Sequence, residues 1–132
     1  MKIVIETIPH AKQRYPTCGD WYFEPDGTLQ IKVSDEIGRQ SSGLVAIHEL
    51  IEVFLCSRGM TLSRSEEGLL TYRVDEFDKK YQGDLKEEEP GDDPKAPYHI
   101  EHSIATAVER LLCAKLGIAW KHHDDRVANL FE

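Results

Sequence analysis

The chain has 132 residues, with 16 Lys and Arg against 24 Asp and Glu, which gives a formal net charge of −8. This length suffices for one domain with its own hydrophobic core, and we expect residues 1–132 to form a single unit. The basic residues are scattered, which disfavours a nucleic-acid partner because phosphate binding needs clustered cations. The apolar runs are far shorter than the ~20 residues of a membrane-spanning helix, so no membrane role is expected.

The first ten residues, MKIVIETIPH, lack the apolar stretch and the small-residue cleavage site of a secretory signal. We therefore expect a cytoplasmic protein. The three cysteines are Cys18, Cys56 and Cys113, and they include no C-x-x-C pair. The sequence thus predicts neither a disulfide framework nor a zinc site built on thiolates.

The first third of the chain is typical of strands. Residues 2–8 form a first candidate strand, and residues 20–24 and 28–34 flank the turn signal Pro25-Asp26-Gly27. Leu29, Ile31 and Val33 alternate with polar residues, as in a hairpin with one solvated face. We expect a small antiparallel sheet of three strands.

The rest of the chain favours three to four helices, which gives an α+β fold with the helices on one face of the sheet. Capping residues and glycines set the expected bounds. The helices are expected from Ser41 or Ser42 to Gly59, from the capping-box pair Ser63 and Glu66 to about Tyr81, from Pro97 to Gly117, and from Asp124 or Asp125 onward. Residues 82–98 are rich in Pro, Gly and Glu, and they predict a long exposed loop.

The segment His48-Glu49-Leu50-Ile51-Glu52 carries the strongest chemical signal. Its helix is apolar nearly all round, and His48 and Glu52 lie one turn apart within or beside the apolar face. An imidazole nitrogen and a carboxylate oxygen at this spacing can bind the same divalent ion. Burying such groups without a partner would be costly.

The pattern His48-Glu49-x-x-Glu52 resembles the active-site helix of the zincin metallohydrolases, H-E-x-x-H, with Glu in place of the second His. The resemblance covers about residues 20–60, because a hairpin before this helix is also similar to small zincins. It implies a minimal zincin-like fold in which His48 is a zinc ligand, Glu49 is the general base and Glu52 occupies the second ligand position. The segment from Pro90 to Leu112 also resembles small bacterial and phage proteins that share the H-E-x-x-E helix, which implies no activity.

Further candidate ligands lie on the two later helices. His102 borders the apolar face of the helix that follows Pro97. On the preceding helix Asp78 lies beside Val74 at the edge of the core, and Asp75 is turned further out. Asp78 is therefore the better candidate ligand by position, and Asp75 the second.

Two other residues are candidates for supporting roles. Glu109 could orient His102, since a carboxylate commonly accompanies a histidine ligand. Tyr98 could donate a hydrogen bond to a bound substrate or pack on the loop.

A site of His48, Glu52, His102 and one aspartate would supply two nitrogens and two oxygens from three helices. This set suits one divalent metal, for which we expect Zn first and Mn, Fe or Ni as alternatives. The leading hypothesis is a metal-binding protein that acts as a metal-dependent hydrolase on a small-molecule or peptide substrate, using a metal-activated water.

Two other functions remain open. The first is a non-enzymatic interaction or phage-associated module with a protein partner, in which these residues are structural. The second is a Mg²⁺-dependent nucleotide hydrolase of the all-helical MazG kind, which holds hard cations with clustered carboxylates.

Structural interpretations also exist for the motifs themselves. His48 and Glu52 could be a simple ion pair at i and i+4. The clusters His122-His123-Asp124-Asp125 and Asp92-Asp93 contain ligand-type residues. We expect the first to belong to a helix start and the second to be solvated in its loop.

Overall fold

The computed structural model describes residues 1–58, 63–64, 70–71 and 74–132. It confirms the α+β class, with a sheet of strand order β1-β3-β2-β5-β4 and four helices in the described residues. The strands are β1 (Ile3–Ile8), β2 (Gly19–Phe23), β3 (Leu29–Ser34), β4 (Ser63–Arg64) and β5 (Leu70–Thr71). The helices are α1 (Arg39–Cys56), α2 (Val74–Lys80), α3 (His99–Leu116) and α4 (Trp120–Ala128), with short 3-10 helices η1 (His10–Lys12), η2 (Asp35–Ile37), η3 (Pro90–Asp92) and η4 (Asn129–Phe131).

Strands β2 and β3 form the antiparallel hairpin that the alternating pattern predicts. Leu29, Ile31 and Val33 are fully buried on one face of β3. Gly27 closes the turn with a φ of 91°, a conformation that a residue without a Cβ adopts at little cost. The hairpin supplies the sheet surface on which α1 packs.

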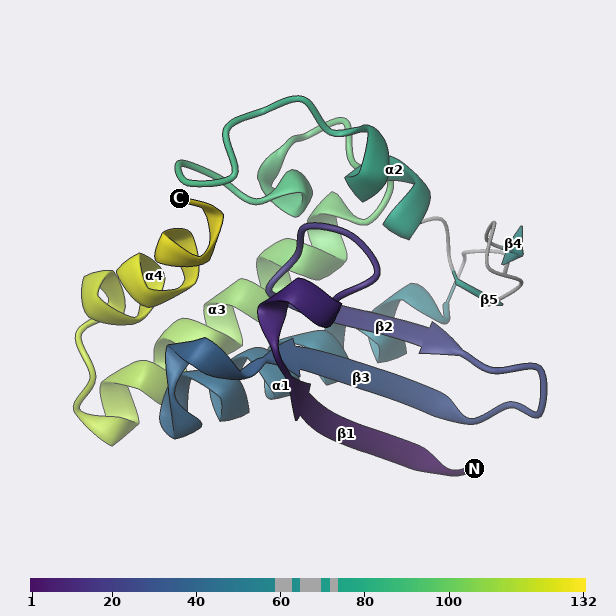
Figure 1. Ribbon diagram of the computed structural model, residues 1–132, viewed down its shortest axis with the longest axis horizontal. Helices are drawn as coiled ribbons and strands as arrows, with labels where there is room; N and C mark the ends of the chain where they lie inside the picture. The colour runs from purple at the N-terminus through teal and green to yellow at the C-terminus, as the bar shows by residue number, and fades with distance from the viewer. Residues whose placement is uncertain (59–62, 65–69, 72–73) are drawn as a thin grey trace.

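Strand β1 pairs in parallel with β3, with Ile5 opposite Ile31, so the prediction of an antiparallel sheet is wrong for this strand. The other side of β3 is taken by β2, which also pairs with β5. Because β2 covers one side of β3, β1 pairs with the opposite side. In Figure 1, β1 forms the outer edge of the sheet at the bottom of the view, with α1 and α3 behind the strands.

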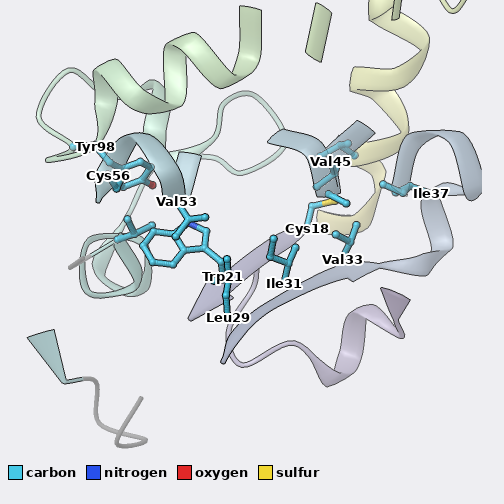
Figure 2. Close-up of a cluster of buried hydrophobic side chains, with 14 residues drawn as sticks. Cys18, Trp21, Leu29, Ile31, Val33, Ile37, Val45, Val53, Cys56 and Tyr98 are labelled. Carbon is cyan, nitrogen blue, oxygen red and sulfur yellow. The ribbon is translucent and has the colours of Figure 1, made fainter. Parts of the chain in front are cut away.

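Helix α1 lies over the hairpin and closes the core. It begins at Arg39, two residues before the earlier of the predicted starts, and ends at Cys56. The predicted end at Gly59 lies outside the described residues. Figure 2 shows Val53 and Cys56 of α1 close to Trp21 of β2, in a cluster that continues to Ile31 and Val45.

The second predicted helix is wrong in its first part. Ser63 belongs to β4, and Leu70 belongs to β5, so the two short strands occupy the beginning of that range. The helix itself, α2, runs only from Val74 to Lys80. Glu66, the other half of the predicted capping box, lies outside the described residues.

Helix α3 agrees with its prediction, because it ends before Gly117, which adopts a φ of 73°. Helix α4 begins at Trp120, earlier than predicted. The segment 82–98 is not uniformly exposed, since Gly91, Ala96 and Tyr98 are buried. Among the described helices, none has the length and apolar character needed to cross a membrane.

Candidate metal centre

The two ligand candidates of the H-E-x-x-E motif lie on the buried face of α1. His48 and Glu52 are 5% and 3% exposed, and the Nε2 of His48 lies 3.2 Å from Oε2 of Glu52. The spacing of four residues produces this contact directly, because side chains at i and i+4 are stacked on one face of a helix. The sequence motif therefore becomes a pair of facing side chains in the core.

His102 of α3 completes a triangle with this pair. Its Nδ1 lies 3.2 Å from Nε2 of His48 and 3.1 Å from Oε2 of Glu52. Three ligand atoms bound to a tetrahedral zinc at ~2.0 to 2.1 Å are separated by about 3.3 to 3.4 Å. The three atoms therefore lie on a triangle close in size to one face of a zinc coordination tetrahedron, and they form a candidate metal-binding group.

The second nitrogen of His48 is held by a carboxylate. Nδ1 lies 2.8 Å from Oε1 of Glu109, a buried residue of α3. With the proton on Nδ1, His48 donates to Glu109 and its Nε2 lone pair faces the triangle. Glu109 thus supports a histidine, but its carboxylate contacts His48 and His123, whereas the sequence suggested His102 as its partner.

His102 is held in the same manner from the opposite side of the site. Its Nε2 lies 3.1 Å from Oδ1 of Asp92 and 3.2 Å from Oε2 of Glu89, which belong to η3 and the residue before it. With the proton on Nε2, His102 donates to these carboxylates, and its Nδ1 lone pair would then be available to an ion at the triangle. Gly91 packs against this ring so closely that an added Cβ would lie 2.4 Å from Cγ of His102.

The remaining oxygen of Glu52 also has a fixed partner. The indole Nε1 of Trp21 in β2 donates to Oε1 of Glu52 over 3.2 Å. All three triangle residues are therefore oriented by side chains from other elements. Such support is typical of metal ligands, because it fixes which atom faces the ion.

The electrostatics of the triangle favour positive charge. Burial opposes the charged form of His48, but its hydrogen bonds to Glu109 and Glu52 prevail, and the pKa of His48 lies well above its usual value. Burial is likewise outweighed at Glu52, where hydrogen bonds from His102 and His48 lower the pKa to about 2. A divalent cation that binds here has to displace protons from the imidazoles. The negative charges of Glu109 and Glu52, which stabilise the protonated imidazole of His48, would also stabilise the bound cation.

Glu49, the predicted base, lies beside the triangle rather than in it. It lines a cavity of about 50 Å³ together with His48, Glu52 and His102. By the measure of about 10 to 15 Å³ per water, this space can hold a few water molecules. Burial and the nearby charge of Glu52 raise the pKa of Glu49 well above its usual value.

The position of Glu49 depends on a glycine of β2. An added Cβ on Gly19 would lie 2.4 Å from Oε1 of Glu49, so the carboxylate rests against bare backbone. The cavity is rich in carboxyl groups, and neither Lys nor Arg is among its described lining residues. Its carboxylates are those of Asp20, Glu49, Glu52, Asp78, Glu89 and Glu109.

The two aspartates predicted as ligands lie elsewhere. Asp78 lines the cavity, but its carboxylate accepts hydrogen bonds from the hydroxyls of Tyr98 and Tyr15. Asp75 is buried 3.2 Å from the guanidinium of Arg14. Neither carboxylate joins a described cluster of metal-type ligand atoms. Tyr98 therefore contacts Asp78 and lines the cavity, where the sequence left its role open.

Sequence reasoning missed several residues that support the site, among them Asp92 and His123. Asp92 is exposed, as expected, but its carboxylate also contacts His102. His123 lies near the start of α4, as expected, but it is also 1% exposed and bridges Glu109 to Ser41, whose Oγ lies 2.9 Å from its Nδ1. No motif spacing connects these positions, since each lies on a different element.

Comparisons with protein-family models, with curated proteins and with solved structures find no significant match.

Proposed function

We propose that the protein is a divalent-metal-binding protein with a catalytic site, in which His48, Glu52 and His102 hold one ion and Glu49 acts as general base in a hydrolysis. The observation that carries the proposal is the convergence of one atom from each of the three ligands within 3.1 to 3.2 Å of one another. Zn²⁺ is the first candidate, because two imidazoles and a carboxylate are a ligand set of catalytic zinc sites.

The number of ligands favours a catalytic site over a structural one. Structural zinc sites are closed by four protein ligands, whereas catalytic sites keep one position open. Here three ligand atoms converge beside a cavity that can hold water. This contrast argues against the interaction module with a purely structural site.

The chemistry divides between the ion and Glu49. A bound Zn²⁺ lowers the pKa of a water ligand to near neutrality and polarises the group under attack. Glu49 accepts the proton of the attacking water and delivers it to the leaving group. Burial and the charge of Glu52 raise the pKa of Glu49, which makes its carboxylate a stronger proton acceptor.

The cavity also indicates the substrate class. Its lining offers no Lys or Arg among the described residues that would bind a phosphate group. Two of the three converging atoms are imidazole nitrogens, whereas Mg²⁺ prefers oxygen ligands. Both points disfavour a nucleotide hydrolase and favour a small neutral or cationic substrate with an amide or ester bond.

Metal content tests the site. The protein, purified without chelator and dialysed against Zn²⁺, is expected to hold about one ion per chain by elemental analysis. His48→Ala, Glu52→Ala and His102→Ala should each lose it. His122→Ala, an exposed histidine of α4, is the matched control and should retain it. Full metal retention by the three ligand variants would rule out the site.

The catalytic part needs a separate test. In the Co²⁺-substituted protein, acetohydroxamate should change the visible absorption spectrum, because an open coordination position accepts the added ligand. A closed structural site would give no change. Glu49→Gln should keep the metal and the hydroxamate response while losing hydrolysis of amide or ester substrates found in a screen.

A further inference from the structure

The outer edge of the sheet carries an apolar strand with unpaired main-chain groups. In the described part of the chain, no strand pairs with the outer side of β1. The carbonyl of Lys2 accepts from the amide of Leu29, so Lys2, Val4 and Glu6 direct their main-chain groups toward β3. By alternation, Ile3 and Ile5 direct theirs outward.

The side chains of this edge are exposed although they lie on the core side of the sheet. Ile3 and Ile5 are 41% and 51% exposed, while their β3 partners Leu29 and Ile31 are fully buried. Proteins usually protect such an edge with a proline, a bulge or an inward charge. Strand β1 has six residues and none of these devices within Ile3–Ile8.

We propose that the protein forms a homodimer in which the β1 strands of two copies pair antiparallel about Val4. In this register Ile3 lies opposite the partner's Ile5, and their outward amides and carbonyls exchange hydrogen bonds. Val4 lies opposite the partner's Val4 on the two-fold axis. The pairing extends the sheet across two copies and covers the exposed isoleucines.

The charges of Glu6 in β1 and of Lys2, which precedes the strand, select this register. Lys2 lies opposite the partner's Glu6, at a pair without main-chain hydrogen bonds, where side chains approach most closely. Glu6 already contacts Lys32 of its own chain over 2.6 Å, so it would lie between two ammonium groups. Moving the axis by one residue, to Ile3 or Ile5, places Lys2 opposite an apolar side chain. Only the register about Val4 matches both the charges and the isoleucines.

Sedimentation velocity of the full chain across the micromolar range tests the proposal. The native protein should have twice the 15.1 kDa mass of one chain. Ile5→Pro removes an amide that faces outward, so it should give a folded monomer with the circular dichroism spectrum of the native protein. Phe54→Glu is the matched control, because Phe54 of α1 is 50% exposed and lies outside the proposed interface. It should remain a dimer.

Charge reversal tests the register without altering the main chain. Lys2→Glu places like charges opposite each other twice and should raise the dissociation constant on the order of tenfold. Adding Glu6→Lys should restore most of the affinity. A monomeric native protein, a dimer that survives Ile5→Pro, or a dimer that Phe54→Glu dissociates would overturn the proposal. Failure of the double reversal to restore affinity would overturn the register. None of these outcomes depends on the metal site.

Discussion

His48 and Glu109 are 61 residues apart in the chain and meet through a 2.8 Å contact between Nδ1 and Oε1. This contact leaves the opposite nitrogen of His48 to face Glu52 and His102. It joins α1 to α3 at the point where the candidate ion would bind. Which nitrogen of His48 would bind the ion is therefore determined by a residue outside the H-E-x-x-E motif.

The role of Glu109 leads to the first prediction. Glu109→Gln keeps the shape of the side chain but removes its charge, so the imidazole of His48 becomes a weaker ligand. We expect a 10- to 100-fold loss of Zn²⁺ affinity, the range typical of changes to a carboxylate behind a histidine ligand. Competition with a fluorescent chelator measures it. Glu101→Gln on the same helix should leave the affinity unchanged, and equal affinity in both variants would contradict the proposed role.

Gly91 provides a test of the His102 position. In Gly91→Ala the new methyl group would lie 2.4 Å from Cγ of His102, so the ring has to move away from the triangle. We expect weaker Zn²⁺ binding in the same competition titration. Gly43→Ala is the control, because a Cβ at Gly43 meets no atom within 4 Å. It should bind Zn²⁺ normally and gain about 0.5 to 1 kcal/mol of stability, since the position lies within a helix.

A substitution at Gly19 can displace the carboxylate of Glu49 while leaving Glu49 itself in the sequence. A Cβ in Gly19→Ala would meet the carboxylate end of Glu49, which is flexible enough to shift at little cost in stability. The variant should retain its metal and its melting temperature but show reduced kcat on any substrate that the native protein hydrolyses. An unchanged kcat would mean that the position of the Glu49 carboxylate does not matter for the reaction.

Asp78 should make the stability depend on pH. Burial and the charge of Glu52 outweigh the hydrogen bond from Tyr98 and raise the pKa of Asp78 to about 8. Because this folded-state pKa exceeds the value of about 3.9 in the unfolded chain, the contribution of Asp78 is greatest below pH 4 and is lost as the pH rises toward 8.

The Asp78→Asn variant isolates this contribution. Denaturant titrations between pH 4 and 8 should show that the native protein loses free energy of unfolding relative to the variant, by at most about 1.4 kcal/mol per pH unit. The measurement uses metal-free protein, so that ion release does not contribute. Parallel curves for the two proteins would show that Asp78 does not titrate in this range.

Local patterns predicted the hairpin, the end of α3 and the pairing of His48 with Glu52. Each of these depends on residues within a few positions of one another: alternation in β3, a left-handed glycine at position 117, and the i to i+4 spacing. His102 was found in addition because it borders an apolar stripe. These are features that helix and strand geometry determines without tertiary contacts.

The features that the sequence did not predict depend on contacts between distant segments. The parallel pairing of β1 follows from which side of β3 remains free, and α2 is shortened because Leu70 pairs with Phe23 of β2. The partners of the two imidazoles come from η3 and α3, and residue spacing carries no information on such contacts. A histidine ligand can be identified from its helix, but the carboxylate that orients it depends on the tertiary fold.

The contacts of His102 with Asp92 and Glu89 link the segment 82–98 to the candidate metal site. Two carboxylates of the segment contact the imidazole that also faces the candidate ion. Loading the site would hold this ring in place, and stripping it would free the ring to turn. The rate at which the amides of residues 89–93 exchange with solvent deuterium would then report metal occupancy, and a protease acting on this segment would cleave the stripped protein first.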